Sequence, residues 1–188
     1  VIYAREYDAA ISPNGNIPVH AFNLISPTFF ANSSTGNKYS LWVNVYGVSE
    51  RYLNVYGEKD LRAQMNQFFH RTYTHPVDGT TLDMKMLCNW YWYDETAILE
   101  TGKGTKDWNF YRYAETLLSA AEAIAQSSGV NAEAAGYLAQ VKARANMEGK
   151  DVSTIASELQ RLGKQAFIEE CWKERLREFP LEMKMWDM

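Results

Sequence analysis

The sequence has few of the residues that mark common catalytic or metal-binding sites. Three histidines occur among 188 residues, without a His-Glu-x-x-His pattern or another paired ligand spacing. The two cysteines, Cys88 and Cys171, lie far apart, without the close spacing of a metal or redox motif. No Gly-x-Ser-x-Gly nucleophile elbow is present. We therefore expect no metal site, no cofactor and no catalytic nucleophile.

The sequence also lacks long apolar runs and an excess of positive charge. No apolar segment approaches the roughly 20 residues that a membrane-spanning helix needs. The net charge is −4 and the pI is about 5.4, which disfavours nucleic acid and anionic lipid as partners. The chain begins Val-Ile-Tyr, without methionine, signal peptide or lipidation cysteine. We interpret it as a fragment of a longer protein.

Two motifs that could suggest chemistry have simpler interpretations. Gly102-Lys103-Gly104-Thr105 lacks the first glycine and the residue order of a phosphate-binding loop, which favours a flexible connector. Glu170, Glu174 and Glu178 follow one another at four-residue steps, so they share one helix face. Basic residues surround them, and an ion-paired or solvated face is therefore favoured over a catalytic carboxylate pair. The sequence predicts a protein that is not an enzyme.

Composition divides the chain into two regions of one domain. Residues 1–107 hold four of the five prolines and many Asn, Gly, Ser and Thr residues, which predicts an irregular, loop-rich ligand-binding segment. Residues 108–188 carry apolar residues at three- and four-residue steps, which predicts helices. The expected fold is mainly α, with short strands in the loop-rich segment. Strand-like patterns occur at 1–7, 41–46 and 84–93, and a helical pattern occurs in the second half of 53–67.

The helical region is predicted to start near Trp108 with a hairpin of the tetratricopeptide (TPR) type. Gly129 is suited to the left-handed position that ends the first helix, and Asn131 can cap the second. Ser153 is expected to cap a third helix that runs to residue 162. Pro180 must end a fourth, which starts at residue 164. The predicted buried side of the fourth helix holds Phe167, Ile168, Cys171, Trp172 and Leu176.

Three ordered motifs resemble the C-terminal half of the SusD/RagB family. Residues 112–123 match the family's Arg-Tyr-Ala-Glu-x-Leu-Leu-x-x-Ala-Glu-Ala helix at every fixed position. Residues 141–145 are similar to its Val-Arg-x-Arg-Ala motif, and residues 174–179 to its Glu-Arg-x-x-Glu-Leu motif. Asp60-Leu61-Arg62 is similar to the family's Asp-Pro-Arg. The chain departs from the family at residues 181–188, where methionines replace the glycine and arginine of Phe-Glu-Gly-x-Arg-Trp.

The resemblance implies a scaffold and a biological setting. The scaffold would be part of a SusD-like α/α superhelix, held by charged hydrogen bonds between helices. The setting would be non-catalytic capture of an oligosaccharide or polysaccharide at the outer-membrane surface of a Bacteroidetes cell. Uptake would follow through a SusC-like TonB-dependent transporter, and an N-terminal lipid outside this chain would provide the anchor. The motif residues with an expected structural role are Arg112, Glu115, Glu122, Arg144, Glu174 and Arg175.

Aromatic residues make up 14% of the chain and suggest the ligand-binding surface. In an extended backbone Trp90 and Trp92 would face one way, and Tyr91 and Tyr93 the other. One pair would then cover the core, and the other pair could stack on the apolar face of a sugar ring. The candidate ligand-binding residues are Trp90, Tyr91, Trp92 and Tyr93, with a smaller group of Trp42, Asn44 and Tyr46. The alternative function is a TPR-like adaptor that binds a protein or peptide.

Overall fold

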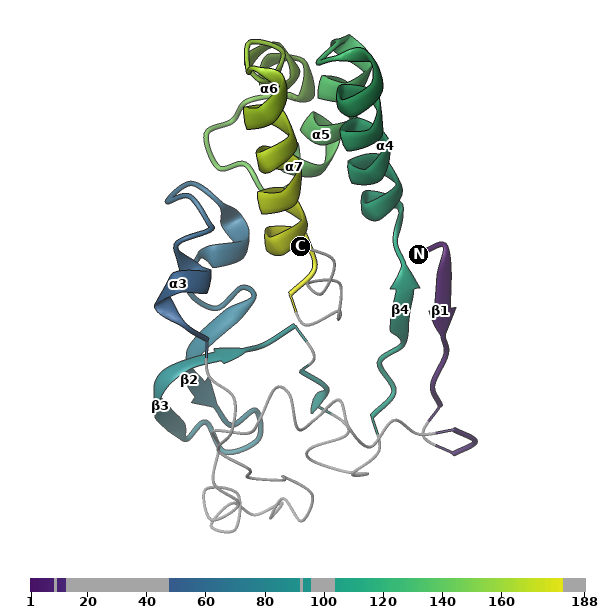
Figure 1. Ribbon diagram of the computed structural model, residues 1–188. Coiled ribbons are helices and arrows are strands. Elements are labelled where there is room, and N and C mark those ends of the chain that lie inside the picture. The colour runs from purple at the N-terminus through teal and green to yellow at the C-terminus, as the bar shows by residue number, and fades with distance from the viewer. Residues whose placement is uncertain (9, 13–47, 92, 96–103, 181–188) are drawn as a thin grey trace. The chain divides into compact units, whose positions relative to one another are not determined.

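The chain folds into two compact units. A computed structural model describes residues 1–8, 10–12, 48–91, 93–95 and 104–180 (Figure 1). The helical unit comprises Val1–Ala4, Asn54–Arg62 and Asn109–Met188, and the strand unit comprises Arg5–Leu53 and Ala63–Trp108. The boundary predicted between residues 107 and 108 adjoins one of these junctions. The assignment of residues 1–107 to ligand binding remains a prediction.

The described residues of the helical unit form four α-helices, and the expectation of a mainly α fold with short strands is confirmed. The first two helices pack on each other as the predicted hairpin, the third packs on the second, and the fourth packs on the first. The helix that was expected to start near Trp108 starts five residues later, because Trp108–Tyr111 forms a strand instead. The helices are α4 (Tyr113–Ser128), α5 (Ala132–Ala143), α6 (Val152–Leu159) and α7 (Lys164–Glu178).

Local residues set the helix ends. Gly129 has a φ of 82° after α4, and the Asn131 side chain accepts a hydrogen bond from Ala134 N at the start of α5, as predicted. The prediction for α6 was wrong, because the cap is Asp151 rather than Ser153. Its carboxylate accepts a hydrogen bond of 2.8 Å from Thr154 N and leaves the serine inside the first turn. The end of α7 two residues before Pro180 is confirmed.

The core of the helical unit lies between the facing sides of its helices. Cys171 is fully buried as predicted, and burial raises its pKa to about 12, so the thiol stays protonated. Trp172 departs from the prediction: it is 38% exposed, and its indole N–H donates to a carboxylate oxygen of Glu122 at the surface, 3.0 Å away. Other fully buried residues are Leu118, Ala121, Ala125, Ala134, Ala135, Leu138, Ala139 and Phe167.

Two pairs of strands complete the described structure. In the strand unit β2 (Phe69–Thr74) pairs antiparallel with β3 (Thr81–Asn89), and the register shifts between His70 and Thr72. The strand predicted at 84–93 is therefore displaced toward the N-terminus. The second pair joins β1 (Tyr3–Arg5) to β4 (Trp108–Tyr111).

The predicted helix within 53–67 is not formed. Its place is taken by the 3₁₀ turn Leu61–Ala63, and a separate short helix, α3 (Glu50–Leu53), precedes this stretch. A carboxylate oxygen of Asp60 accepts a hydrogen bond of 3.0 Å from Arg62 N, and this local bond favours a turn over a longer helix. The strand predicted at 41–46 lies outside the described residues.

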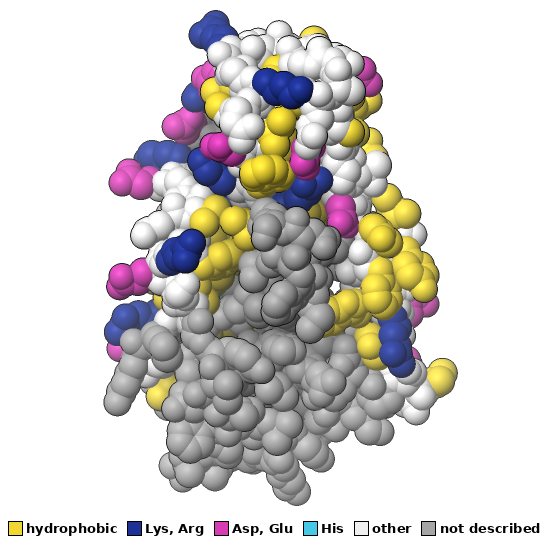
Figure 2. Space-filling model, viewed as in Figure 1, with side chains coloured by type: hydrophobic (Ala, Val, Ile, Leu, Met, Phe, Trp, Pro, Cys, Tyr) yellow, Lys and Arg dark blue, Asp and Glu magenta, His cyan; other side chains and the backbone are white. Residues whose placement is uncertain are grey.

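Apolar side chains gather on the surface over β1 and β4, at the right of Figure 2. The Tyr3 and Phe110 rings stack with centroids 5.2 Å apart. The two segments that carry these rings are also joined by a backbone hydrogen bond of 2.9 Å from Ile2 N to Tyr111 O. The exposed apolar residues in this part of the helical unit are Val1, Ile2, Tyr3, Phe110, Tyr111 and Tyr113.

Candidate functional site

An aromatic groove of about 240 Å³ lies in the strand unit. It is formed by β2, the residues that follow β3 and the turn before β2. Its lining combines flat rings with short polar side chains, as sugar-binding surfaces require. The lining residues are Asn66, His70, Thr72, Tyr73, Thr74, Trp90 and Tyr93.

Stacked rings form the floor of the groove. The centroid of Trp90 lies 4.4 Å from that of His70, with planes 13° apart, and 4.9 Å from that of Tyr93, with planes 15° apart. The Tyr73 ring is tilted against that of Trp90, with centroids 5.5 Å apart, and against that of Tyr93, with centroids 6.2 Å apart. His70, Trp90 and Tyr93 are half-buried. Each such contact contributes about 0.5–1.5 kcal/mol beyond the burial of area, so the rings hold one another in place.

A turn after β3 brings Trp90 and Tyr93 together. The Asn89 side chain accepts a hydrogen bond of 2.9 Å from Tyr91 N, and Tyr93 N donates to Trp90 O at 3.0 Å. The expectation that Trp90 and Tyr93 face opposite ways was therefore wrong, because the strand ends at Asn89 and a turn follows it. Trp90 and Tyr93 consequently share the groove.

Polar groups line the side of the groove formed by β2 and the turn before it. Thr72 and Thr74 are exposed, and the Thr74 hydroxyl lies 3.1 Å from that of Thr81 on β3. Asn66 has a φ of 64°, a left-handed conformation that asparagine tolerates better than most residues. Asn66 N also donates to Phe69 O at 3.1 Å, which fixes the turn before β2. An amide and two hydroxyls are therefore available to bind sugar hydroxyls.

Burial controls the ionisation of the groove residues. Burial raises the pKa of Tyr73 and of Tyr93, and the neighbouring phenol of Tyr73 and the carboxylate of Glu95 add to the increase at Tyr93. Both phenols therefore stay protonated, and Tyr93 donates to Glu95 Oε2 at 3.0 Å. Burial also lowers the pKa of His70, and hydrogen bonds to the backbone of residues 66 and 67 offset this only in part. The imidazole is therefore neutral at pH 7.

This pKa shift predicts a pH dependence of stability. Because the pKa of His70 is lower in the folded chain than its ordinary value of 6.5, the unfolded chain binds this proton at higher pH. The contribution of neutral His70 to the free energy of unfolding is thus complete above about pH 6.5, and it is lost as the pH falls toward the pKa of the folded state. His70→Phe keeps a flat ring but cannot titrate. Urea unfolding at about pH 7.5 and about pH 5.5 should show a larger loss of stability in the wild type than in the variant; equal losses would contradict the shift.

Of the other candidates, only Tyr91 lies in the described part of the chain, and it does not line the groove. Tyr91 is half-buried and packs edge-on against Phe68 at 5.6 Å, and its carbonyl oxygen accepts a hydrogen bond from Lys106. Four candidates lie outside the described residues: Trp42, Asn44, Tyr46 and Trp92. The sequence interpretation missed the contribution of β2. Its run of aromatic and β-branched residues at 69–74 is typical of a strand and could have indicated it.

The motif residues of the helical unit lie in two groups of ion pairs. In the first, Arg112 and Arg144 approach one Glu178 oxygen at 2.7 and 2.6 Å, while Arg62 lies 2.9 Å from Glu174. In the second, Arg175 pairs with Glu122. Glu115 is half-buried near the start of α4. The first group, here called the ion-pair cluster, consists of Asp60, Arg62, Arg112, Lys142, Arg144, Glu170, Glu174, Arg177 and Glu178.

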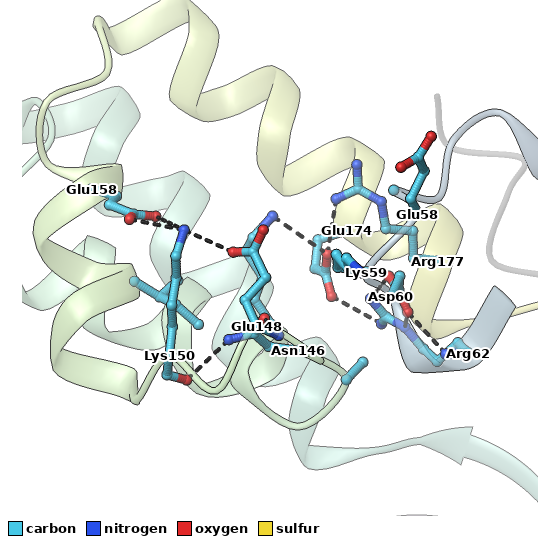
Figure 3. Close-up of a pocket in the computed structure, with 14 residues that line it drawn as sticks. Glu58, Lys59, Asp60, Arg62, Asn146, Glu148, Lys150, Glu158, Glu174 and Arg177 are labelled. Carbon is cyan, nitrogen blue, oxygen red and sulfur yellow. Dashed lines mark hydrogen bonds and ion pairs between the residues drawn. The ribbon is translucent and has the colours of Figure 1, made fainter. Parts of the chain in front are cut away.

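A larger cavity of about 440 Å³ opens beside this cluster in the helical unit (Figure 3). Its charges pair with one another: Lys150 lies 2.8 Å from Glu148 and 3.0 Å from Glu158, and Arg177 lies 3.1 Å from Glu174. No aromatic ring is among the described residues that line it. Paired charges without a ring offer little to a sugar, so the aromatic groove is the better candidate site.

Two features common in other sites were not found in the described part of the chain. Residues 1–8, 10–12, 48–91, 93–95 and 104–180 contain no group of three or more His, Cys, Asp or Glu side chains that could hold a metal ion. No helix in those ranges is long and apolar enough to cross a membrane.

Comparison with known proteins identifies the family. Residues 30–188 match the model of the SusD family. A crystal structure of a SusD superfamily protein from Parabacteroides distasonis is 23% identical, with a TM-score of 0.75, and the match covers 98% of this chain and 37% of that one. A second, from Bacteroides fragilis, is 18% identical, with a TM-score of 0.63 and coverage of 99% and 39%.

The chain thus spans less than two fifths of the length of either solved structure. No curated protein matches it. The structural matches establish the fold, and the family model covers most of the chain, including the three motifs of the helical unit. This chain belongs to the SusD family.

Proposed function

We propose that this chain is part of a surface protein that captures glycans without chemical change. The observation that carries the proposal is the stack of His70, Trp90 and Tyr93 beside exposed hydroxyl and amide groups. A pyranose ring has an apolar face of C–H groups and a rim of hydroxyls. The apolar face would lie against the ring surface that the stack of His70, Trp90 and Tyr93 leaves uncovered in the groove, and the hydroxyls would bond to Asn66 and Thr72. Membership of the SusD family supports the same assignment.

Binding in this groove would be reversible and individually weak. The groove is small and open to few sugar units at once, so one unit would be held loosely and a polymer more firmly through repeated contacts. Glycoside hydrolysis needs two carboxyl groups across the scissile bond. The carboxylates of α7, Glu170, Glu174 and Glu178, are engaged in ion pairs instead. We therefore propose a protein without enzymatic activity.

The family suggests where capture would lead. We propose that the whole protein is lipid-anchored at the outer membrane and delivers its glycan to a SusC-like TonB-dependent transporter. Nucleic acid is not a proposed partner, since the net charge is −4. The rival proposal is an adaptor that binds a peptide along the helices. It has less support, because the facing sides of α4 and α5 are filled by their own core residues.

Replacing Trp90 with alanine tests the proposal. The variant loses the central ring of the stack, so glycan affinity is expected to fall about tenfold. The measurement is affinity electrophoresis over a broad panel of soluble polysaccharides, with wild type and variant in the same gels. The matched control is Trp172→Ala, which removes an exposed tryptophan from the helical unit and should leave retardation unchanged. If no polysaccharide retards the wild type, the proposed function is wrong.

A further inference from the structure

The aromatic groove is lined without charged side chains, as far as the described residues show. Its polar side-chain atoms belong to an amide, to hydroxyls and phenols, to the indole of Trp90 and to the imidazole of His70. Burial lowers the pKa of that imidazole, so it is uncharged at pH 7. The cavity of the helical unit is lined very differently, with acidic and basic residues in close pairs. Neutrality is thus a property of this groove rather than of every cavity in the chain.

Three described charged residues that contact the groove residues or their neighbours do not favour an anion. Tyr93, one of its rings, donates to a carboxylate oxygen of the exposed Glu95 at 3.0 Å. On β2, Arg71 lies 3.4 Å from Asp83 of β3, so its charge is balanced. Lys106 donates to the carbonyl oxygen of Tyr91, which is not a lining residue. An acidic sugar in the groove would therefore lose water without gaining a cation from the described lining residues, and one of the rings it would contact is hydrogen-bonded to a carboxylate.

The size of the groove limits how much of a ligand it can enclose. Pockets that enclose a whole small ligand have volumes of roughly 300–1,000 Å³. The groove, at about 240 Å³, lies below this range. One sugar unit fits it, and the neighbouring units of a longer chain would lie outside.

From these observations we infer that the groove holds one unit of a neutral glycan and discriminates against units that carry carboxylate or sulfate. The inference rests on the proposed function and makes it more specific. It specifies a ligand without charge, because the described lining consists of the uncharged side chains of Asn66, Thr72 and Thr74 and of the rings. Neutral glycan binding should also be nearly insensitive to salt, because no ion pair forms with the ligand.

The experiment compares one polysaccharide in two charge states. The neutral glycan that most retards the wild-type protein is oxidised at its primary alcohols to uronate, which keeps the backbone and linkages. Affinities for the two forms are measured by titration calorimetry at about 0.15 M salt. The neutral form is expected to bind at least about fivefold more tightly. Equal or tighter binding of the oxidised form overturns the inference but leaves glycan capture intact. Retardation by no glycan at all would instead count against the proposed function.

A charge variant tests the electrostatic explanation separately. Glu95→Gln removes the carboxylate but keeps an oxygen that can accept a hydrogen bond from Tyr93. The affinity for the neutral glycan should therefore stay unchanged. The ratio of the affinities for the neutral and the oxidised glycan should fall by about twofold to fivefold. The matched control is Glu169→Gln, the same change at an exposed position on α7 in the helical unit. This control should leave the difference in affinity between the neutral and the oxidised glycan unchanged. An unchanged difference in Glu95→Gln would contradict the inference.

Discussion

Replacing Arg62 with methionine is expected to lower the free energy of unfolding by about 3 kcal/mol or more, because it removes a buried cation from buried carboxylates. Arg62 is 7% exposed, and Nη1 lies 2.9 Å from an oxygen of Glu174 and 3.1 Å from one of Glu178. Glu174 is fully buried. Methionine keeps much of the apolar stem, so the loss would come mainly from the charge. The remaining cations of the ion-pair cluster limit the loss to the lower end of the range for broken buried pairs.

The control for this variant is Arg161→Met, which makes the same change at an exposed position after α6. It should cost less than about 0.5 kcal/mol. Urea unfolding followed by far-ultraviolet circular dichroism reports the helices directly and gives both values. A loss below about 1 kcal/mol for Arg62→Met would show that the cluster is solvated, contrary to the burial of Arg62 and Glu174.

Phe167→Ala is expected to destabilise the helical unit by about 3–5 kcal/mol. Phe167 begins the buried side of α7, is fully buried and belongs to the same core as Leu118 and Leu138. Alanine would leave a cavity that rigid neighbouring helices cannot close, and this cavity adds to the loss of apolar burial. The measurement is again urea unfolding followed by circular dichroism.

The matched control is Phe110→Ala on β4, where the ring is 41% exposed. The variant mainly gives up the stacking of this ring on Tyr3, so the cost should stay below about 1.5 kcal/mol. A Phe167→Ala variant no less stable than Phe110→Ala would contradict the proposed packing of α7.

Features of the fold that depend on neighbouring residues could be predicted from the sequence. Gly129, Asn131 and Pro180 each act through their own backbone conformation or through a residue three positions away, and their roles were predicted correctly. The start of α4 was missed because Trp108–Tyr111 pairs with β1, more than 100 residues earlier in the chain. Pairing over such a distance leaves no periodic signal in a short window.

In the candidate site, too, features set by neighbouring residues could be predicted, and contacts between distant residues could not. Trp90 and Tyr93 could be proposed from the density of aromatic residues, but their contact depends on a turn stabilised by Asn89. His70 joins them only because β2 pairs with β3, and this pairing was not predicted. In the helical unit, Arg62 could not be matched to Glu178 from sequence spacing, because 116 positions separate them.

The most direct test of glycan capture by the aromatic groove is a titration followed by nuclear magnetic resonance. Each of the six tryptophans has one indole N–H group and therefore gives one signal in a proton–nitrogen spectrum. The Trp90 signal can be assigned as the one missing from Trp90→Phe. Upon addition of an oligosaccharide of the glycan that retards the protein, the Trp90 signal should shift until saturation while that of Trp172 stays in place. A Trp90 signal that does not move in the saturated protein would contradict binding in the groove.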